Sequence, residues 1–356
     1  MAAVTSVTLS GSNAPLAELF DVALLDLDGV VYIGADAVPG VPEALKQARV
    51  SGMRLAFVTN NAARPPQAVA EHLNHLGIAA EADEVVNSSQ AAAHYLADRL
   101  PAGAKVLVVG TEGLHVALRE RGLVPVTSAD DAPAAVVQGY SPTLSWQDLA
   151  EGAVAIGTGV PWVATNLDPT VPSPRGPLPG NGSLVAALRH ATGVTPIVTG
   201  KPEPTMHRES VERSGAVSPI VVGDRLDTDI EGANAVGCPS LLVLSGVTGA
   251  ADLLIAPLNQ RPNYLGHDLA ALLYAHPAPT GREGGWTCGP WRAEVSAEGG
   301  LTLARSGDGD ETADGLDALR ALCAAAWSVG ESAHPDWTVQ GRDEPARAEL
   351  VRLSLA

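Results

Sequence analysis

Residues 24–30 read LLDLDGV, an apolar run that ends in two carboxylates and a glycine. A short apolar run of this kind suits a strand buried in a parallel sheet. Residues at the carboxyl end of such a strand project into the crevice where open α/β sheets bind ligands. Asp26 and Asp28 would point the same way, and two carboxylates so close repel each other unless a cation separates them or one keeps its proton. The stretch therefore predicts a site for a hard divalent cation such as Mg2+.

A calcium loop or a simple acidic turn is the alternative interpretation of residues 26–29. An EF-hand loop needs further oxygen ligands at fixed spacing and a late bidentate Glu. The next residues, VVYI at 30–33, supply none. Calcium is therefore disfavoured, and Gly29 is expected to let the backbone turn tightly away from the strand.

Two further segments place polar groups after apolar stretches. Residues 54–61 read RLAFVTNN, so that Thr59, Asn60 and Asn61 follow a predicted strand; a hydroxyl and a backbone N–H there can bind phosphoryl oxygens, although a plain strand-to-loop turn has the same composition. Residues 197–202 read IVTGKP and deliver Lys201. This segment is not a Walker P-loop, because a proline stands where Ser or Thr must bind the metal.

A third apolar strand ends in acids. Residues 219–229 read PIVVGDRLDTD. Asp224 comes directly at the strand end and is the candidate for a second metal-binding carboxylate. Asp227 and Asp229 are also explained by the preference of a helix N-terminus for acidic side chains.

In this order, the four segments resemble the motifs of the haloacid dehalogenase (HAD) superfamily: DxDG, a Thr after a strand, a Lys, and GDxxxxD. The resemblance covers roughly residues 20–265, and it is closest to the branch of p-nitrophenylphosphatase-like and NagD-like phosphatases. Within that branch the chain is similar to actinobacterial glycerol 3-phosphate phosphatases with an extra C-terminal domain. The fold this implies is α/β: a Rossmann-like core with a parallel sheet, an inserted α/β cap of the C2 type, and a small α+β C-terminal domain.

The resemblance also implies a mechanism. Asp26 would be the nucleophile that forms an aspartyl phosphate, and Asp28 the general acid and base that protonates the leaving alkoxide and then activates water. Mg2+ would be held by Asp26, Asp28 through its backbone carbonyl, and Asp224. The remaining expected roles are phosphoryl binding by Thr59, Asn60, Asn61 and Lys201, and orientation of a metal-bound water by Asp229. In the cap, Asn166 and Asp168 are candidates for substrate contacts, although the same residue types are common turn formers.

The spacing of the motifs predicts the domains. Between Thr59 and Lys201 lie roughly 140 residues, far more than one βα connection needs, and they alternate between strand-like and helix-like stretches. The expected division is a flexible leader over 1–17, the core over 18–82 and 191–265, the cap over 83–190, a linker over 266–281, and a small C-terminal domain over 282–356. In related enzymes that domain resembles an acetyltransferase (GNAT) fold, but the sequence has no pyrophosphate-binding loop for acetyl-CoA, so a packing or regulatory module is expected.

Composition limits the partners. With 40 acidic and 22 basic residues among 356, the net charge is −18, which argues against nucleic acid or an anionic membrane as partner. No run approaches the length of a membrane span and no secretory signal is apparent. Three scattered cysteines form neither a metal-binding pair nor a disulfide framework. A cytoplasmic location is expected, and a homo-oligomer is left open.

The expected activity is Mg2+-dependent hydrolysis of a small phosphate monoester, glycerol 3-phosphate first, in glycerophospholipid recycling. Within the same class the alternative is a broader phosphatase acting on pyridoxal phosphate, phosphoglycolate, nucleoside monophosphates or p-nitrophenyl phosphate. From another class the alternative is a non-catalytic sensor of phosphometabolites or acyl-CoA. A phosphotransferase would use the same aspartyl phosphate with an acceptor other than water.

Overall fold

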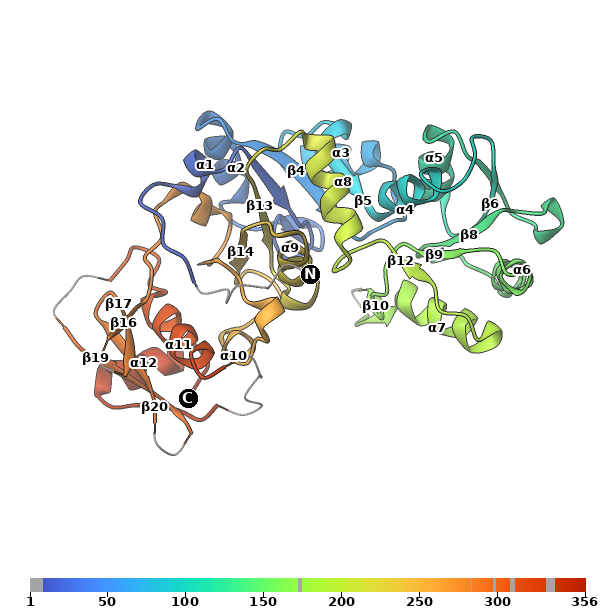
Figure 1. Ribbon diagram of the computed structural model, residues 1–356. Coiled ribbons are helices and arrows are strands. Elements are labelled where there is room, and N and C mark those ends of the chain that lie inside the picture. Colours follow the sequence, from blue (N-terminus) through green and yellow to red (C-terminus); the bar gives the residue numbers. More distant parts are fainter. Residues whose placement is uncertain (1–8, 172–174, 283, 297–298, 308–310, 331–336) are drawn as a thin grey trace. The chain divides into compact units, whose positions relative to one another are not determined.

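The computed structural model describes residues 9–171, 175–282, 284–296, 299–307, 311–330 and 337–356 (Figure 1). The chain forms two compact units, residues 1–55 with 216–356, and residues 56–215. Both contain parallel sheets with helices, so the predicted α/β class is confirmed.

A parallel sheet forms the centre of the first unit. Its strands β1 (Val22–Leu25), β13 (Pro219–Gly223), β14 (Ser240–Val243) and β15 (Tyr264–Gly266) lie in the order β15-β14-β13-β1. Nearly every residue of these strands is buried, as expected when helices cover both faces of a sheet. The register pairs Leu25 with Val222, and the chain leaves both strands at the same edge, where the predicted acids follow.

Short helices and a hairpin complete this part of the unit. The hairpin is β2 (Tyr32–Ile33) with β3 (Asp36–Ala37), and it lies directly after the LLDLDGV segment. The helices are α1 (Leu16–Leu19), α2 (Val41–Val50), the π-helical turn η3 (Leu226–Ile230), α9 (Glu231–Val236) and α10 (Ala250–Leu254), with 3-10 turns η4 (Leu258–Gln260) and η5 (Leu269–Leu273).

The second unit holds a five-stranded parallel sheet in the order β12-β9-β8-β6-β7. Side chains of α4 and α5 pack on one face of this sheet and those of α6 and α7 on the other. These helices are drawn in cyan to yellow-green in Figure 1. The strands are β6 (Lys105–Val109), β7 (Val124–Val126), β8 (Ala135–Gln138), β9 (Trp162–Ala164) and β12 (Ile197–Val198), and the helices are α4 (Ser88–Ala97), α5 (Glu112–Glu120), α6 (Trp146–Gly157) and α7 (Asn181–Thr192).

The other elements of this unit precede, follow or interrupt the five-stranded sheet in the sequence. Strand β4 (Arg54–Thr59) begins just before the unit boundary at residue 55 and pairs in parallel with β5 (Val85–Asn87). The remaining elements are α3 (Pro66–His75), the 3-10 turns η1 (Ala82–Glu84) and η2 (Ala129–Asp131), the short pair β10 (Thr170–Val171) and β11 (Leu178–Pro179), and α8 (Pro204–Ser214).

Strand pairing does not follow the limits expected for the inserted domain. The cap was placed at 83–190, yet β5 pairs with β4, and β12 at 197–198 pairs with β9 of the five-stranded sheet. The segment that delivers Lys201 thus follows an edge strand of the insert. Sequence spacing could not show this, because a two-residue strand is identified only by its partner.

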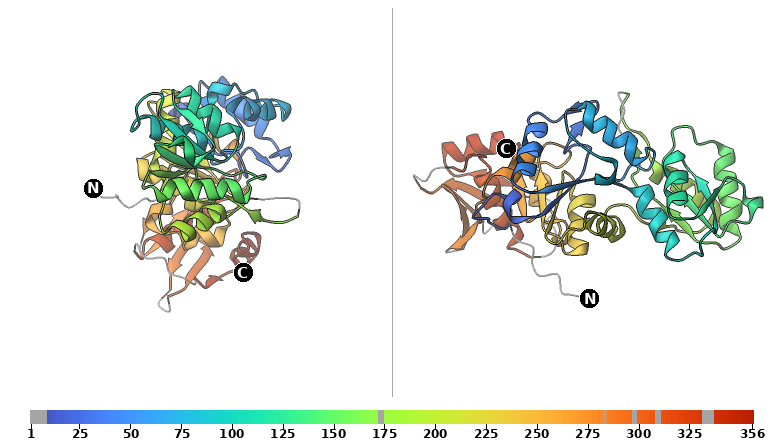
Figure 2. Two further views of the ribbon diagram at one scale, coloured as in Figure 1. Left: turned by 90° about the vertical axis from the view of Figure 1, so that its right-hand side faces the viewer. Right: turned by 90° about the horizontal axis from the view of Figure 1, so that it is seen from above.

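The C-terminal part of the first unit is a mixed sheet in the order β16-β17-β18-β19-β20. Neighbours are antiparallel except β19 and β20, which are parallel; the sheet is orange to red in Figure 2. The elements are β16 (Thr280–Arg282), β17 (Gly285–Cys288), β18 (Trp291–Val295), β19 (Leu301–Arg305), α11 (Asp317–Trp327), β20 (Val339–Gly341) and α12 (Glu344–Arg352).

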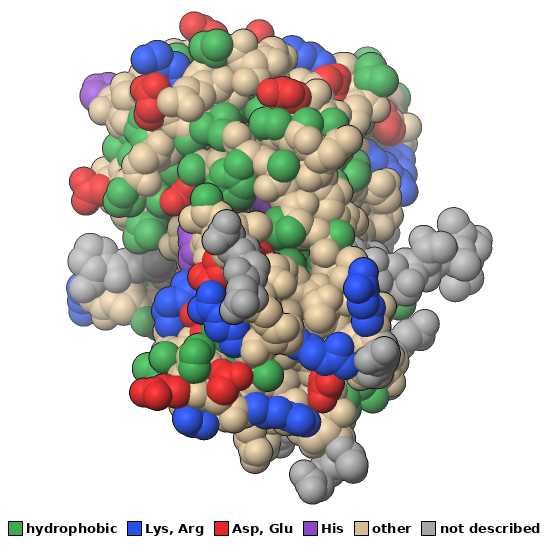
Figure 3. Space-filling model, turned by 90° about the vertical axis from the view of Figure 1, so that its left-hand side faces the viewer, with side chains coloured by type: hydrophobic (Ala, Val, Ile, Leu, Met, Phe, Trp, Pro, Cys, Tyr) green, Lys and Arg blue, Asp and Glu red, His purple; other side chains and the backbone are tan. Residues whose placement is uncertain are grey.

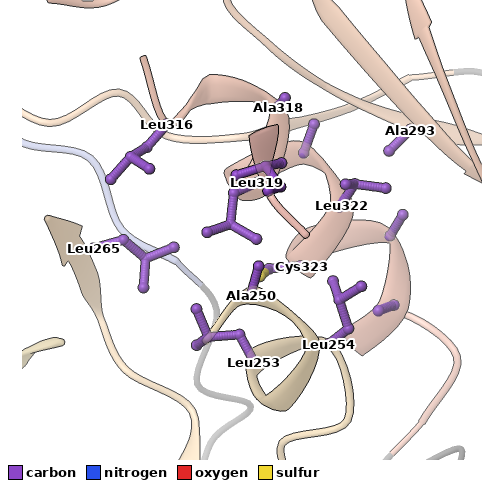
Figure 4. Close-up of a cluster of buried hydrophobic side chains, with 14 of the residues drawn as sticks. Ala250, Leu253, Leu254, Leu265, Ala293, Leu316, Ala318, Leu319, Leu322 and Cys323 are labelled. Carbon is purple, nitrogen blue, oxygen red and sulfur yellow. The ribbon is translucent and has the colours of Figure 1, made fainter. Parts of the chain in front are cut away.

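Helix α11 joins this sheet to the parallel-sheet part of the unit. One cluster of buried side chains contains Leu319, Leu322 and Cys323 of α11 together with Leu253 and Leu254 of α10 (Figure 4). All residues of α11 are buried, which a helix of the outer layer would not show. The C-terminal domain has a sheet of its own and shares a hydrophobic core with the parallel-sheet part of the unit.

Both segments expected to be irregular carry structure. The predicted linker, 266–281, contains η5, with Leu269 and Leu272 fully buried, and the buried His276. Of the predicted leader, residues 1–8 lie outside the described part. From residue 9 onward, Leu9 and Leu16 are buried and Ser10 N donates to Asn263 O. Apolar residues within these two segments supply the packing.

The surface carries charges of both signs. On the face drawn in Figure 3, basic side chains stand among acidic ones. Within the described residues, none of the helices combines the length and the apolar character needed to cross a membrane.

A buried ion network holds the start of α11. Arg320, 1% exposed, donates to both oxygens of Asp314 and lies 3.4 Å from Asp317, and its Nη2 also donates to Leu265 O of β15. Burial alone would raise the pKa of the Asp314 carboxyl, but the hydrogen bonds and charge of Arg320 outweigh burial and hold that pKa below its usual range. Both acids thus share Arg320 as their counter-charge.

Replacing Arg320 with Met should lower the free energy of unfolding by about 3–5 kcal/mol, because buried carboxylates lose their counter-charge. Urea denaturation followed by tryptophan fluorescence measures the loss. The control is Arg342→Met: Arg342 is 56% exposed and pairs with Glu294 at 3.3 Å, so its loss should cost less than about 1 kcal/mol. Equal stability of the two variants would contradict this account of Arg320.

Candidate active site

Three carboxylates converge at the carboxyl edge of the first unit's sheet. Asp26 follows β1, Asp224 follows β13, and Asp229 lies in the turn η3; one oxygen of each lies within 4.8 Å of the others. Asp224 and Asp229 are buried. Carboxylate oxygens at this spacing are the ligands that Mg2+ takes in proteins, and like charges this close require a cation or a shared proton. The donor set therefore fits a divalent cation.

Backbone groups hold the buried members of this cluster in place. Val247 N donates to Asp224 Oδ2 at 2.7 Å, and Arg225 N donates to Asp229 Oδ2 at 3.2 Å. Hydrogen bonds of this type favour the ionised carboxylate. A Cβ added at Gly246 would overlap the Asp224 carboxylate, so this glycine allows the backbone to approach the acid.

Asp28 lies in a different environment from Asp26. Its side chain is exposed and belongs to a tight turn in which Gly29 has a φ of +87° and Gly29 N donates to Tyr32 O. Asp28 is outside the three-carboxylate cluster. An exposed carboxyl can exchange protons with solvent, which suits a general acid and base more than a metal ligand.

The loop after β14 is part of this site and was not singled out from the sequence. Besides the bond from Val247, Thr248 N donates to Asp224 O at 3.2 Å, and Ser245 Oγ donates to Gly29 O at 2.7 Å. Residues 245–249, here called the bracket loop, thus contact both acidic segments. The signal was present: LLVL followed by SGVTG is a fourth apolar run that ends in small polar residues.

The second unit gathers the other predicted residues around Asn60. The Asn60 carboxamide accepts from Lys201 N at 2.8 Å and donates to Lys201 O at 3.2 Å and to Asp168 Oδ2 at 3.3 Å. Asn60 O accepts from Asn166 Nδ2 at 2.7 Å. Binding of phosphoryl oxygens by Asn60 stays a prediction, and the structure shows that the Asn60 side chain links three loops.

Thr59, Asn61 and Asn166 make local hydrogen bonds. Thr59 Oγ1 accepts from Asn61 N, and Asn61 Oδ1 accepts from Ala63 N, in the pattern of a polar turn. Asn166 is buried, and its Oδ1 accepts from Asp168 N at 3.2 Å. These bonds shape the loops, and binding of substrate by the same residues stays a prediction.

Lys201 is buried beside a neutral histidine. Its side chain is 4% exposed, and Nζ donates to Val58 O at 3.3 Å. Burial, and then the charge of Lys201, lower the pKa of His207 on α8 to about 3. Because His207 is uncharged at neutral pH, it adds no second positive charge at this position.

A second group of acids and a histidine lies between α4, α5 and α8. His94 contacts Glu209, whose other oxygen accepts from Arg121 at 2.8 Å, and Arg213 lies 3.8 Å from the same carboxylate. Glu209 is buried and has cations on several sides. We interpret this group as an ion-pair network that fixes α8, and not as a metal site.

Comparison with known proteins identifies the family. Residues 23–124 match the model of haloacid dehalogenase-like hydrolases, and residues 198–272 match a second model of HAD-hydrolase-like domains. Residues 288–355 match a GCN5-related N-acetyltransferase like domain. The last match confirms the GNAT-like character expected of the C-terminal domain.

Individual relatives cover most of the chain. It is 46% identical over 351 residues to D-glycerol 3-phosphate phosphatase of Mycobacterium tuberculosis, spanning 96% of each protein. A crystal structure of the glycerol phosphate phosphatase of that organism with magnesium superposes with a TM-score of 0.87 at 46% identity, covering 96% of this chain and 99% of the other. The p-nitrophenyl phosphatase of Archaeoglobus fulgidus matches 71% of this chain and 98% of its own, with a TM-score of 0.66 at 31% identity. The chain therefore belongs to the haloacid dehalogenase-like hydrolases.

Proposed function

We propose that this protein is a Mg2+-dependent phosphomonoesterase whose substrate is glycerol 3-phosphate. The observation that carries the proposal is the three-carboxylate cluster of Asp26, Asp224 and Asp229, with oxygens within 4.8 Å at the ends of adjacent parallel strands. The substrate rests on the 46% identity, over 96% of both chains, to D-glycerol 3-phosphate phosphatase. The two parts of the proposal have different support and are tested separately.

Asp26 acts as the nucleophile in the proposed reaction. A carboxylate oxygen of Asp26 bonds to phosphorus while the ester P–O bond breaks. Asp28 gives its proton to the departing alkoxide of glycerol. Water then attacks the aspartyl phosphate, Asp28 takes the proton of that water, and the bond between Asp26 and phosphorus breaks to release inorganic phosphate.

Asp26, Asp224 and the backbone carbonyl of Asp28 are the proposed Mg2+ ligands, and Asp229 lies close enough to orient a ligand water. Bound Mg2+ would neutralise part of the charge on the phosphoryl oxygens and on the acids that approach them. The bracket loop holds Asp224 in position through the Val247 N–H.

The proposed ligands of the phosphoryl oxygens are Lys201, Thr59, Asn60 and Asn61. The proposed contacts to the rest of the substrate are Asn166 and Asp168 of the insert. Lys201 is buried and therefore interacts strongly with an anion. The Asn60 side chain bonds to both the N–H and the C=O of Lys201. Asn60 thus acts on catalysis by positioning Lys201.

The location that we propose is the cytoplasm. Cys238, Cys288 and Cys323 are all free thiols in the structure, which suits a reducing compartment. Small phosphate esters are the proposed partners, and self-association of this chain remains a separate question for a solution measurement.

Asp26→Asn should abolish turnover of glycerol 3-phosphate with Mg2+ and leave the fold intact, because the amide is a poor nucleophile and Asp26 lies at a strand end. Phosphate release measures activity, and circular dichroism checks the fold. Asp130→Asn makes the same change at an exposed position of the insert and should keep wild-type turnover. Normal turnover by folded Asp26→Asn protein, with deamidation excluded by mass spectrometry, would disprove the assigned nucleophile.

A panel of phosphate esters tests the substrate. With Mg2+, glycerol 3-phosphate should give a kcat/KM at least about tenfold above pyridoxal phosphate, phosphoglycolate, nucleoside monophosphates and p-nitrophenyl phosphate, since contacts made by the insert must distinguish the alcohols. EDTA should abolish all release. Equal hydrolysis of every ester would support a phosphatase but reject glycerol 3-phosphate as its specific substrate. Hydrolysis of none of the esters would favour the alternative of a non-catalytic sensor.

Asn60→Ala should lower kcat/KM on the order of tenfold, because Lys201 loses the hydrogen bonds that orient it. Asn74→Ala is a matched control: Asn74 makes comparable bonds to Ala70 and Ala80 in the same unit and should affect stability alone. Steady-state kinetics measure kcat/KM of both variants, and thermal melts measure their stability. Unchanged kinetics in folded Asn60→Ala protein would show that Lys201 needs no such support.

A further inference from the structure

Two tryptophans of the C-terminal domain hydrogen-bond to the end of helix α10. Trp327 Nε1 donates to Leu253 O at 2.9 Å, and Trp337 Nε1 donates to Leu254 O at 3.2 Å. The last carbonyls of a helix have no partner within the helix, and α10 has only five residues. The C-terminal domain thus supplies side-chain donors to the carboxyl end of α10, where Leu253 O also accepts from Ala256 N at 3.2 Å.

Apolar packing reinforces these bonds. Leu253 and Leu254 of α10 lie in one buried cluster with Leu319, Leu322 and Cys323 of α11 (Figure 4). Arg261, shortly after α10, donates to Trp327 O at 3.4 Å and to Gly330 O at 2.9 Å. A helix of five residues is only marginally stable by itself. The position of α10 therefore depends on the domain that packs against it.

Helix α10 continues directly from the bracket loop. Gly249 precedes the helix, and its N–H donates to Asp252 Oδ2 at 2.8 Å. From residue 248 back to residue 245, the loop makes the two bonds to Asp224 and the bond to Gly29. A displacement of α10 therefore moves the groups that orient a proposed metal ligand.

We propose that the C-terminal domain is a positioning element of the metal site, acting from Trp327 and Trp337 through α10 and the bracket loop on Asp224. This inference rests on the proposed Mg2+ site and assigns a role to a domain that resembles an acetyltransferase. In this role the domain needs no ligand of its own. Its contribution is to reduce the number of positions that the bracket loop adopts before the cation binds.

The test uses Trp327→Phe in the full-length protein, which keeps a large apolar ring and removes the N–H. Mg2+ binding is measured by titration calorimetry without substrate. The dissociation constant should rise by up to about fivefold, the equivalent of one buried hydrogen bond. In activity assays the half-saturating Mg2+ concentration should rise by the same factor, while kcat and the substrate KM at saturating Mg2+ stay at wild-type values.

Trp291→Phe is the matched control. Trp291 belongs to the same buried cluster, and its Nε1 donates to Glu311 at 2.9 Å within the C-terminal domain. This variant loses an equivalent bond that does not reach α10, and it should bind Mg2+ as the wild type does. Trp337 lies at a less buried position, and Trp337→Phe should also weaken Mg2+ binding. This variant replaces Trp327→Phe in the test if Trp327→Phe does not fold.

The outcomes separate this inference from the proposed function. Wild-type affinity for Mg2+ in folded Trp327→Phe and Trp337→Phe, or equal weakening in Trp291→Phe, would overturn the positioning role. Wild-type protein that binds Mg2+ but hydrolyses no ester would reject the proposed function. The Mg2+ affinities of the variants would then still test the positioning role. Wild-type protein that binds no Mg2+ would reject both.

Discussion

The first unit is organised around the repulsion between three carboxylates that lie with oxygens within 4.8 Å of one another. Backbone N–H donors and a bound divalent cation would offset this repulsion. The donors come from Val247 and Arg225, and the small Gly246 lets the backbone approach. The parallel register of β1 and β13 brings the acids to one edge. The hydrogen bonds of the bracket loop, and the packing that supports that loop, follow from this requirement.

In the second unit, neutral oxygen acceptors and a carboxamide hold a buried positive charge. Lys201 is buried, and a buried ammonium needs oxygen acceptors and a fixed position. Val58 O provides an acceptor, and the carboxamide of Asn60 holds the backbone of Lys201 on both sides. The same carboxamide bonds to Asp168. Positions of the lysine and of a loop of the insert are thus coupled through one side chain.

The C-terminal domain is continuous with the hydrophobic core of the first unit. Its helix α11 is buried on all sides. Arg320 of α11 donates to Leu265 O of β15, and Arg261 donates in the opposite direction to Gly330 O. A domain that served only as an independent module would bury less of this helix and would make fewer such bonds. The GNAT-like domain packs on the parallel-sheet part of the unit through α11.

The sequence by itself determined the strands, their polar ends, and the identity of Asp26, Asp28, Lys201 and Asp224 as candidates. These are local signals, because an apolar run and the residue that ends it are adjacent in the chain. Only the tertiary structure decided that β12 joins the sheet of the insert, that residues 9–17 pack against the body, that Asn60 links three loops, and that Trp327 caps α10. Each of these depends on which distant surfaces meet, since a hydrogen bond between residues 74 positions apart, as between Trp327 and Leu253, leaves no periodic trace in either segment.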